Sequence, residues 1–373
     1  MNRTVKRAML LSICALITGC ADSGNEKAKE TTAMPQTTTD ASSGETPASV
    51  STEAATETED VPETEKATET QEQTQEPKVA AADVSALFTG NFDDFVHLDD
   101  YGYIEGDRYL IYLEKDVNVP GDLITRIEEI MALDEKVLGL SFDVSDYAEF
   151  SDWRHAYYGD VFDGLPEDKD RIHIMISKET GDGYIEWSVS DEIMLFDQDF
   201  DPQYSSGEVI YHELAHVLRL RQSPMLGQVL EEGIAIYAEY NVSMERNTPC
   251  WSCIQFVTDE YSIPNFDDSL IREDPEEAFR EYNVADRSSG QPEYQLGIRL
   301  VSFLVDEYGE DIFAKLSQTA AKYDFEEKDN DKVIAILKEA TSDDVFDRFK
   351  VWMDEGWKVV NDRIVEYLRG YGF

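Results

Sequence analysis

Residues 209–217 read Val209-Ile210-Tyr211-His212-Glu213-Leu214-Ala215-His216-Val217, in which two histidines stand four positions apart. In an α-helix, residues four apart lie on one face, so both imidazole rings point the same way, one turn from each other. This spacing suits a single metal ion, and Zn²⁺ is bound by imidazole nitrogen at about 2.0–2.1 Å. Glu213 is placed to reach a water molecule at that ion, where a general base must stand.

A catalytic zinc site needs a third protein ligand and one open position. Residues 230–237 read Leu230-Glu231-Glu232-Gly233-Ile234-Ala235-Ile236-Tyr237 and are predicted to belong to a second helix. On a helical wheel Glu232 lies at the margin of the apolar arc and Glu231 nearly opposite, so Glu232 is the predicted ligand and Glu231 the fallback. Gly233 has no side chain and should allow this helix to approach the first one closely. Cys250 and Cys253 are further candidates.

The chain resembles the gluzincin metallopeptidases of the thermolysin and alanyl-aminopeptidase type, through His212-Glu213-x-x-His216 followed by Glu232-Gly233-x-Ala235. The resemblance covers roughly residues 105–355, and ordered motifs of this kind are its specific part. It implies a zinc-dependent peptidase in which His212, His216 and Glu232 bind the metal and Glu213 activates the water. Fifteen residues separate His216 from Glu232, somewhat fewer than in those two families.

A third motif, Tyr294-Gln295-Leu296-Gly297, is similar to the Tyr-x-x-Gly segment of the same family. There the tyrosine hydroxyl hydrogen-bonds the oxyanion of the tetrahedral intermediate, which implies that role for Tyr294. The alternative is an aromatic side chain packed at a helix start. Residues 190–196 lack the Gly-x-Met-Glu-Asn element by which aminopeptidases hold a substrate amino terminus, so an aminopeptidase is not expected.

The N-terminal residues 1–19 are typical of a secretory signal, because Arg3, Lys6 and Arg7 precede a short apolar run. The end of that run, Ile17-Thr18-Gly19-Cys20, resembles the bacterial lipobox, which implies cleavage before Cys20 and acylation of that cysteine. Residues 21–80 contain 13 Thr and 14 Asp+Glu against 4 Lys and no aromatic residue, which predicts a disordered tether over residues 20–80. We therefore expect a lipoprotein anchored to the outer face of the cell membrane. A plain secreted protein is the alternative.

The two neighbouring cysteines in Cys250-Trp251-Ser252-Cys253 allow three interpretations: a local disulfide, a redox pair, or half of a second metal site. The disulfide is favoured because export places the chain in an oxidising setting and because no second C-x-x-C occurs. The histidines outside the first motif, His97, His155 and His173, stand in unrelated contexts and receive no role.

The charge of the chain is strongly negative, since 32 Lys+Arg face 79 Asp+Glu among 373 residues, for a formal net charge of −47. Such a field repels nucleic-acid phosphates and excludes nucleic-acid binding. It is expected to favour solubility outside the cell, with attraction of cationic peptides or Ca²⁺ as a weaker option. No run of eighteen or more apolar residues occurs, so no transmembrane helix is expected.

The remaining residues, 81–373, are expected to form one zinc metallopeptidase-like domain of the α+β class. Apolar, β-branched and aromatic runs predict strands at residues 109–113, 172–176 and 192–196. Helical spacing predicts a helix over residues 121–139, opened by Pro120, and later helices over residues 206–221, 226–241, 292–308, 310–322, 330–340 and 343–367. The sequence thus predicts a small N-terminal β-sheet with a mainly helical C-terminal half, and the resemblance implies a gluzincin-like architecture.

Two other functions are weighed against a peptidase that acts on a peptide or protein substrate. The first is a non-catalytic cell-envelope lipoprotein that keeps the peptidase fold as a binding module, against which the intact ligand residues argue. The second is the solute-binding lipoprotein of a transporter, whose paired α/β lobes are not suggested by a helical second half.

Overall fold

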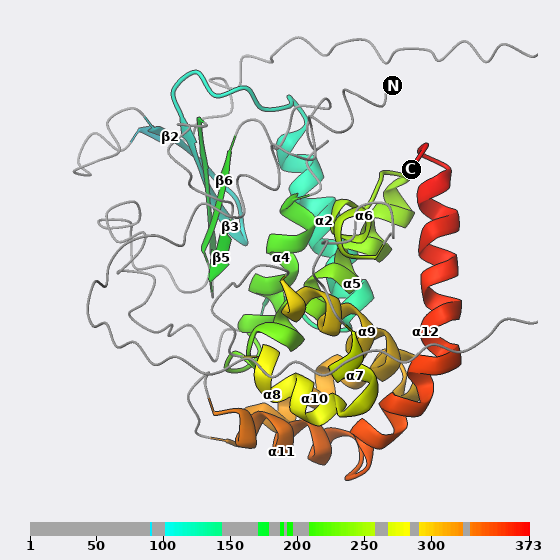
Figure 1. Ribbon diagram of the computed structural model, residues 1–373. Helices are drawn as coiled ribbons and strands as arrows, with labels where there is room; N and C mark the ends of the chain where they lie inside the picture. The colour runs from blue at the N-terminus through cyan, green and yellow to red at the C-terminus, as the bar shows by residue number, and fades with distance from the viewer. Residues whose placement is uncertain are drawn as a thin grey trace, which may run out of the picture. The chain divides into compact units, whose positions relative to one another are not determined.

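The computed structural model describes residues 90–91, 101–143, 171–178, 187–189, 192–196, 209–257, 268–283, 291–323 and 329–373. Within these residues the chain forms a six-stranded sheet, with a helix between two of its strands, and then a series of further helices (Figure 1). The predicted signal sequence, Cys20 and the tether lie outside the described residues, as do His97 and His155. None of the described helices is both long enough and apolar enough to cross a membrane.

The sheet has the strand order β1-β2-β3-β4-β6-β5. Its strands are β1 (Gly90–Asn91), β2 (Tyr101–Glu105), β3 (Tyr109–Glu114), β4 (Ile172–Ser177), β5 (Trp187–Val189) and β6 (Glu192–Phe196). The middle strands β3, β4 and β6 are parallel, with Ile174 opposite Ile111 on one side and Ile193 on the other. Antiparallel strands complete both edges. The three parallel strands were predicted, whereas β1, β2 and β5 are too short or too mixed in composition to show a strand pattern.

The helix predicted over residues 121–139, between the first two predicted strands, is confirmed with slightly shorter bounds. Helix α2 (Leu123–Leu138) follows β3 and precedes β4, because parallel neighbours need a crossover connection. Only its expected opening at Pro120 is wrong. The helix begins at Leu123 after Asp122, and the carbonyl of Pro120 accepts a hydrogen bond from the Leu123 N–H at 3.1 Å. Pro120 therefore lies in the turn that leads into α2.

The remaining described elements are helical, which agrees with a helical C-terminal half. They are α4 (Val209–Leu220), α5 (Gln228–Arg246), α6 (Trp251–Phe256), α7 (Ser269–Glu273), α8 (Pro275–Tyr282), α9 (Pro292–Tyr308), α10 (Ile312–Ala320), α11 (Asn330–Ala340) and α12 (Val345–Arg369). Helices α9 and α11 have the predicted bounds, and α4, α5, α10 and α12 differ by a few residues. The short helices α6, α7 and α8 were not predicted, since a helical period needs more residues to become visible.

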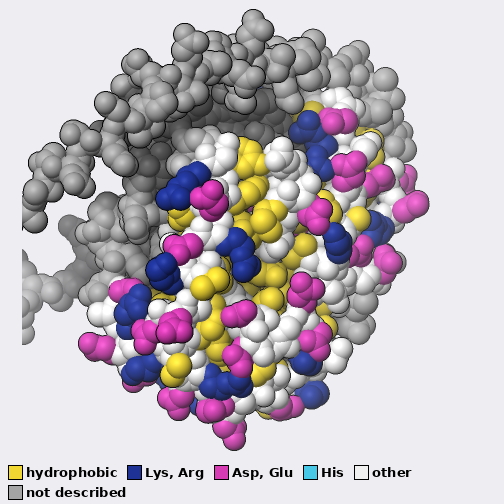
Figure 2. All heavy atoms as spheres, turned by 90° about the vertical axis from the view of Figure 1, so that its right-hand side faces the viewer, with side chains coloured by type: hydrophobic (Ala, Val, Ile, Leu, Met, Phe, Trp, Pro, Cys, Tyr) yellow, Lys and Arg dark blue, Asp and Glu magenta, His cyan; other side chains and the backbone are white. Residues whose placement is uncertain are grey.

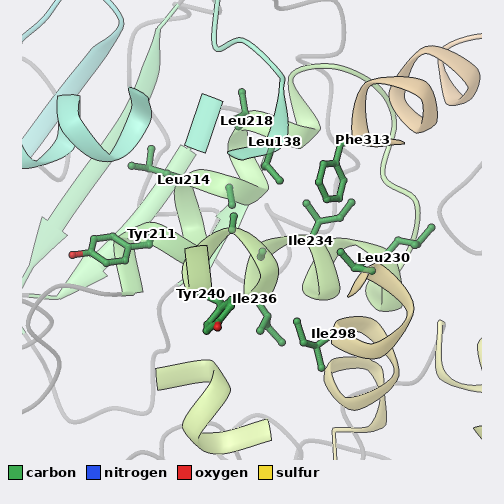
Figure 3. Close-up of a cluster of buried hydrophobic side chains, with 14 of the residues drawn as sticks. Leu138, Tyr211, Leu214, Leu218, Leu230, Ile234, Ile236, Tyr240, Ile298 and Phe313 are labelled. Carbon is green, nitrogen blue, oxygen red and sulfur yellow. The ribbon is translucent and has the colours of Figure 1, made fainter. Parts of the chain in front are cut away.

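Apolar side chains from the helices and the sheet form one buried core. Helix α4 packs on β5, β6 and α5, and α2 covers both α4 and α5. Figure 3 shows how residues from distant parts of the chain meet there: Leu138 from α2, Leu214 and Leu218 from α4, Ile234 from α5 and Phe313 from α10. This packing fixes α4 and α5 side by side.

Helices α5 and α9 approach each other closely in this core, where Gly233 faces Gly297. A Cβ atom at Gly297 would lie 2.5 Å from the carbonyl oxygen of Val229 and 2.8 Å from the backbone nitrogen of Gly233, so the two backbones touch. The expectation that Gly233 admits α4 is therefore wrong. The missing side chain makes room for α9 instead, because Gly233 and Glu232 point in different directions around α5.

We predict that Gly297→Ala destabilises the fold by about 1–3 kcal/mol, since the added methyl group overpacks a contact between two backbones. Denaturant-induced unfolding would measure this change. Gly370→Ala is the matched control, because Gly370 has a helical φ of −59° and its nearest atom, the Tyr367 carbonyl oxygen, is 3.1 Å from an added Cβ. Equal effects of the two substitutions would contradict the close contact.

Candidate metal centre

Helix α4 presents the two histidines of the first motif on one face. His212 and His216 are partly exposed, whereas Leu214 and Val217 on the same helix are buried in the core. The two imidazole rings meet edge to face, with centroids 4.7 Å apart, and their Nε2 atoms are 3.1 Å apart. Two nitrogen electron pairs therefore point to one place.

Helix α5 brings Glu232 to the same place. Its Oε2 atom lies 3.2 Å from Nε2 of His212 and 3.4 Å from Nε2 of His216. The carboxylate is buried, as the wheel predicted for the margin of the apolar arc. The structure thus brings together the three side chains that the sequence proposed as ligands, in a grouping that could hold one metal ion.

The spacing of these three atoms fits a tetrahedral zinc site. Ligand atoms placed about 2.0–2.1 Å from one ion at tetrahedral angles are separated from each other by about 3.3 Å. The three observed separations are 3.1, 3.2 and 3.4 Å. Two imidazole nitrogens with one carboxylate oxygen also form a donor set that zinc enzymes use, with a fourth position open for water or substrate.

Electrostatic interactions within the cluster favour positive charge at its centre. Burial alone would lower the pKa of His212, but the carboxylates of Glu232 and Glu239 outweigh it and hold this pKa well above its usual value. Burial would raise the pKa of Glu232, but His216 and His212 outweigh it and hold this pKa well below its usual range. A divalent cation would be attracted by the same carboxylates, in place of the proton that the raised pKa of His212 retains.

A carboxylate that the sequence analysis missed, that of Glu239, lies beside His212 at ion-pair distance. Oε2 of Glu239 lies 3.4 Å from Nδ1 of His212, on the side of the ring that faces away from Glu232. Its other oxygen accepts hydrogen bonds from the Ser252 N–H at 3.0 Å and from the Cys250 thiol at 3.5 Å. Outer carboxylates of this kind orient metal-binding histidines. The sequence could have indicated this residue by its position, because Glu239 lies two helical turns after Glu232 on the same face of α5.

The predicted general base and the fallback ligand occupy different surroundings. Glu213 is buried beside His212 and contributes to the negative potential around that ring. The helical wheel placed Glu231 opposite the apolar arc, on the side expected to face solvent. Glu231 is buried instead, because α5 is buried on nearly every side. Its carboxylate pairs with Arg219 at the end of α4, and this pairing neutralises the buried charge. Glu231 is therefore occupied and does not join the histidines.

Tyr294 lies in the first turn of α9, one turn before Gly297. Its ring is half-buried and stacks on Phe256 of α6, with centroids 4.5 Å apart and an angle of 21° between the planes. Because Gly297 touches Gly233, the residue after Glu232, this end of α9 lies near the predicted metal ligands. The role of the Tyr294 hydroxyl at an oxyanion stays a prediction.

The cysteines of the C-x-x-C motif are free and buried, so the structure does not contain the expected disulfide. The Cys250 sulfur instead accepts a hydrogen bond from the Cys253 N–H at the start of α6, while its thiol donates to Glu239. Burial raises the pKa of both thiols, which keeps them protonated. His173, to which no role was given, lies in β4, where its Nδ1 is 2.7 Å from the hydroxyl of Tyr112.

One buried acid near the centre lacks a partner among the residues that the structure describes. Asp134 of α2 is 0% exposed, and neither of its carboxylate oxygens has a hydrogen bond there. Burial, reinforced by Glu135 and opposed by His212, raises the pKa of this carboxyl well above its usual value. The folded protein therefore disfavours the charged form of the Asp134 carboxyl.

Comparisons with known proteins give only distant likenesses. No family model matches the chain, and no curated protein matches its sequence. Among solved structures, native yeast LTA4 hydrolase is 18% identical with a TM-score of 0.40 and matches over 69% of this chain and 39% of that one.

An M1 zinc metallopeptidase from Deinococcus radiodurans is 12% identical with a TM-score of 0.36, and the match covers 67% of this chain and 50% of that one. Another similar structure is a functionally unknown conserved protein from Bacillus anthracis. The Bacillus anthracis protein is 12% identical with a TM-score of 0.37, and the match covers 71% of this chain and 51% of that one. The chain spans about half the length, or less, of these structures. Any functional conclusion therefore depends on the geometry of its own side chains.

We predict that Asp134→Asn makes stability less dependent on pH. The folded pKa of Asp134 is raised above the unfolded value of about 3.9, so its contribution to stability is fully present below about pH 4 and is lost as the pH rises towards the folded pKa. Relative to the variant, the unaltered protein should lose up to about 1.4 kcal/mol per pH unit in that window. Urea unfolding at several pH values, with a chelator present, would measure the difference.

The control for this comparison is Ser317→Ala. Ser317 is another buried polar residue whose hydroxyl has no partner among the described residues, but it carries no charge. Its substitution should change the unfolding free energy by the same amount at each pH. A constant gap between Asp134→Asn and the unaltered protein would contradict the raised pKa of Asp134.

Proposed function

We propose that His212, His216 and Glu232 bind one zinc ion and that the protein uses it to hydrolyse peptide bonds. The observation that carries this proposal is the spacing of the three donor atoms, 3.1, 3.2 and 3.4 Å, which is the spacing of ligands around one small ion. The order of the motifs along the chain, similar to that of the gluzincin metallopeptidases, supports it. An intact donor set favours an enzyme over a binding module that keeps only the fold.

The side chains around this centre have separate tasks in the proposed reaction. Zinc, when bound, supplies Lewis-acid chemistry by acidifying water and polarising a carbonyl group. Glu213 accepts a proton from the attacking water and then donates it to the leaving amine nitrogen. One water is consumed, and the peptide bond yields a carboxylic acid and an amine. Tyr294 is proposed to donate a hydrogen bond to the oxyanion that develops at the carbonyl oxygen.

The place of action is proposed from the N-terminal sequence alone. The apolar run after Arg3, Lys6 and Arg7, and its end at Cys20, support export and attachment of lipid to that cysteine. The protein would then stand on the outer face of the cell membrane. Its substrate would be a peptide or protein within reach of the tether.

Two substitutions separate metal binding from catalysis. Glu213→Gln should keep one zinc per chain but reduce peptide turnover by about 10²–10⁴-fold, because the general base is lost. His212→Ala should lose both zinc and turnover. Metal analysis of the purified protein would measure the first property. Cleavage of a peptide library with and without a chelator would measure the second.

His173→Gln is the control for loss of a buried histidine. His173 bonds with Tyr112 inside the sheet and is not one of the three ligands, so this variant should retain zinc. A folded, metal-free wild-type chain would favour the binding module, and full activity of Glu213→Gln would contradict the role of Glu213.

A further inference from the structure

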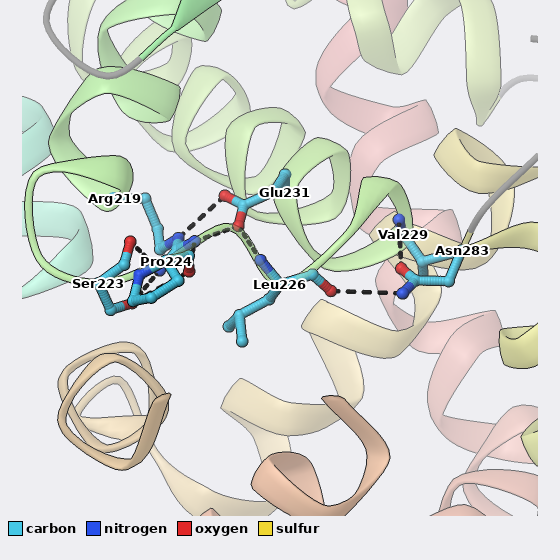
Figure 4. A network of polar contacts seen from close by, with 7 residues as sticks. All are labelled: Arg219, Ser223, Pro224, Leu226, Val229, Glu231 and Asn283. Carbon is cyan, nitrogen blue, oxygen red and sulfur yellow. Dashed lines mark hydrogen bonds and ion pairs between the residues drawn. The ribbon is translucent and has the colours of Figure 1, made fainter. Parts of the chain in front are cut away.

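An ion pair between Arg219 and Glu231 joins the two helices that carry the predicted ligands (Figure 4). Both side chains are almost completely buried, at 1% and 2% exposure. The guanidinium meets the carboxylate with two parallel bonds: Nε donates to Oε2 at 2.9 Å, and Nη2 donates to Oε1. This bidentate arrangement fixes direction as well as distance.

The connection between α4 and α5 wraps around the same guanidinium. Nη1 donates to the hydroxyl of Ser223 and to its carbonyl oxygen, and Nη2 donates to the carbonyl oxygen of Pro224 at 2.6 Å. Together with the bonds to Glu231, these contacts use all five N–H groups of Arg219. Glu231 in turn accepts the Leu226 N–H at 2.7 Å. Three residues of the connection, Ser223, Pro224 and Leu226, are thus tied to one buried ion pair.

The pair lies directly beside the predicted ligands in sequence and in space. Arg219 follows His216 by three residues, which places it on the same side of α4, one turn further along. Glu231 immediately precedes Glu232 in α5. The helix therefore offers two adjacent carboxylates at the end of a short connection, and each points about 100° away from the other.

This adjacency creates a problem of register. A slip of α5 by one residue would turn it by about 100° and move it by about 1.5 Å, which would bring a different residue to the histidines. We propose that Arg219 is a positioning residue that selects between the two carboxylates: it binds Glu231 and thereby leaves Glu232 directed at His212 and His216. This inference rests on the proposed zinc site. Buried polar partners that specify one register are known from coiled coils.

A second buried group fixes the beginning of α5 along its axis. The side-chain oxygen of Asn283 accepts the Val229 N–H at 3.1 Å, and its amide donates to the carbonyl oxygen of Leu226 at 3.4 Å. Gly227, with φ of +83°, leaves the space that the Asn283 side chain fills. Asn283, at the end of α8, therefore fixes the first turn of α5 along its axis. Arg219 fixes the rotation of α5, and so the directions in which Glu231 and Glu232 point.

The experiment measures zinc affinity in Arg219→Met and in the double variant Arg219→Met with Glu231→Leu. The single variant leaves a buried carboxylate unpaired. The double variant removes both charges, although the Leu226 N–H loses its carboxylate partner, and is expected to be the more stable of the two. Zinc affinity would be measured by competition with a chromogenic chelator, at a temperature where circular dichroism shows the fold intact. We expect affinity to fall by about 10–100-fold in the double variant, as for loss of other residues that orient ligands.

Arg246→Met is the matched control, because Arg246 ties the other end of α5 to Glu129 of α2 and to the hydroxyl of Tyr211. It should lower stability without changing zinc affinity. If the double variant folds and binds zinc as tightly as the unaltered chain, the positioning role of Arg219 is wrong while the zinc site stands. If the unaltered chain binds no zinc, the proposed function fails, and this inference fails with it.

Discussion

Two imidazole nitrogens from α4 and one carboxylate oxygen from α5 lie within 3.4 Å of one another. The packing of the surrounding helices holds these three atoms at that spacing. Such a grouping is unfavourable unless a cation or a shared proton lies among the donors, so the surrounding structure has to hold them together. The apolar core keeps α4 beside α5, the contact of Gly233 with Gly297 sets the depth of α5 against α9, and buried polar bonds fix its first turn.

The parts of this centre that depend on local periodicity could be predicted from the sequence. His212 and His216 share a helix face because of the helical repeat alone, and the burial of Glu232 follows from its place at the margin of an apolar arc. The long helices were found for the same reason. The three parallel strands were found because each is a short run of apolar, β-branched and aromatic residues. A single sequence displays both kinds of local pattern.

The parts that depend on contacts between distant residues could not be predicted. Nothing local shows that Gly233 meets Gly297, that Arg219 neutralises Glu231, or that the Cys250 thiol bonds to Glu239. A helical wheel treats α5 as having one buried side, whereas the structure surrounds it with α2, α4, α6 and α9. The wrong expectations for Gly233, Glu231 and the cysteines all concerned residues whose partners come from another element.

The touching backbones of α5 and α9 also restrict how this protein can change over generations. Where two side chains meet, a gain of volume on one helix can be offset by a loss on the other. Neither glycine has a side chain that could become smaller, so a larger residue at Gly233 or Gly297 cannot be compensated at the other position. In descendants of this chain the two positions should therefore each be retained separately, without the paired substitutions that mark ordinary packed neighbours.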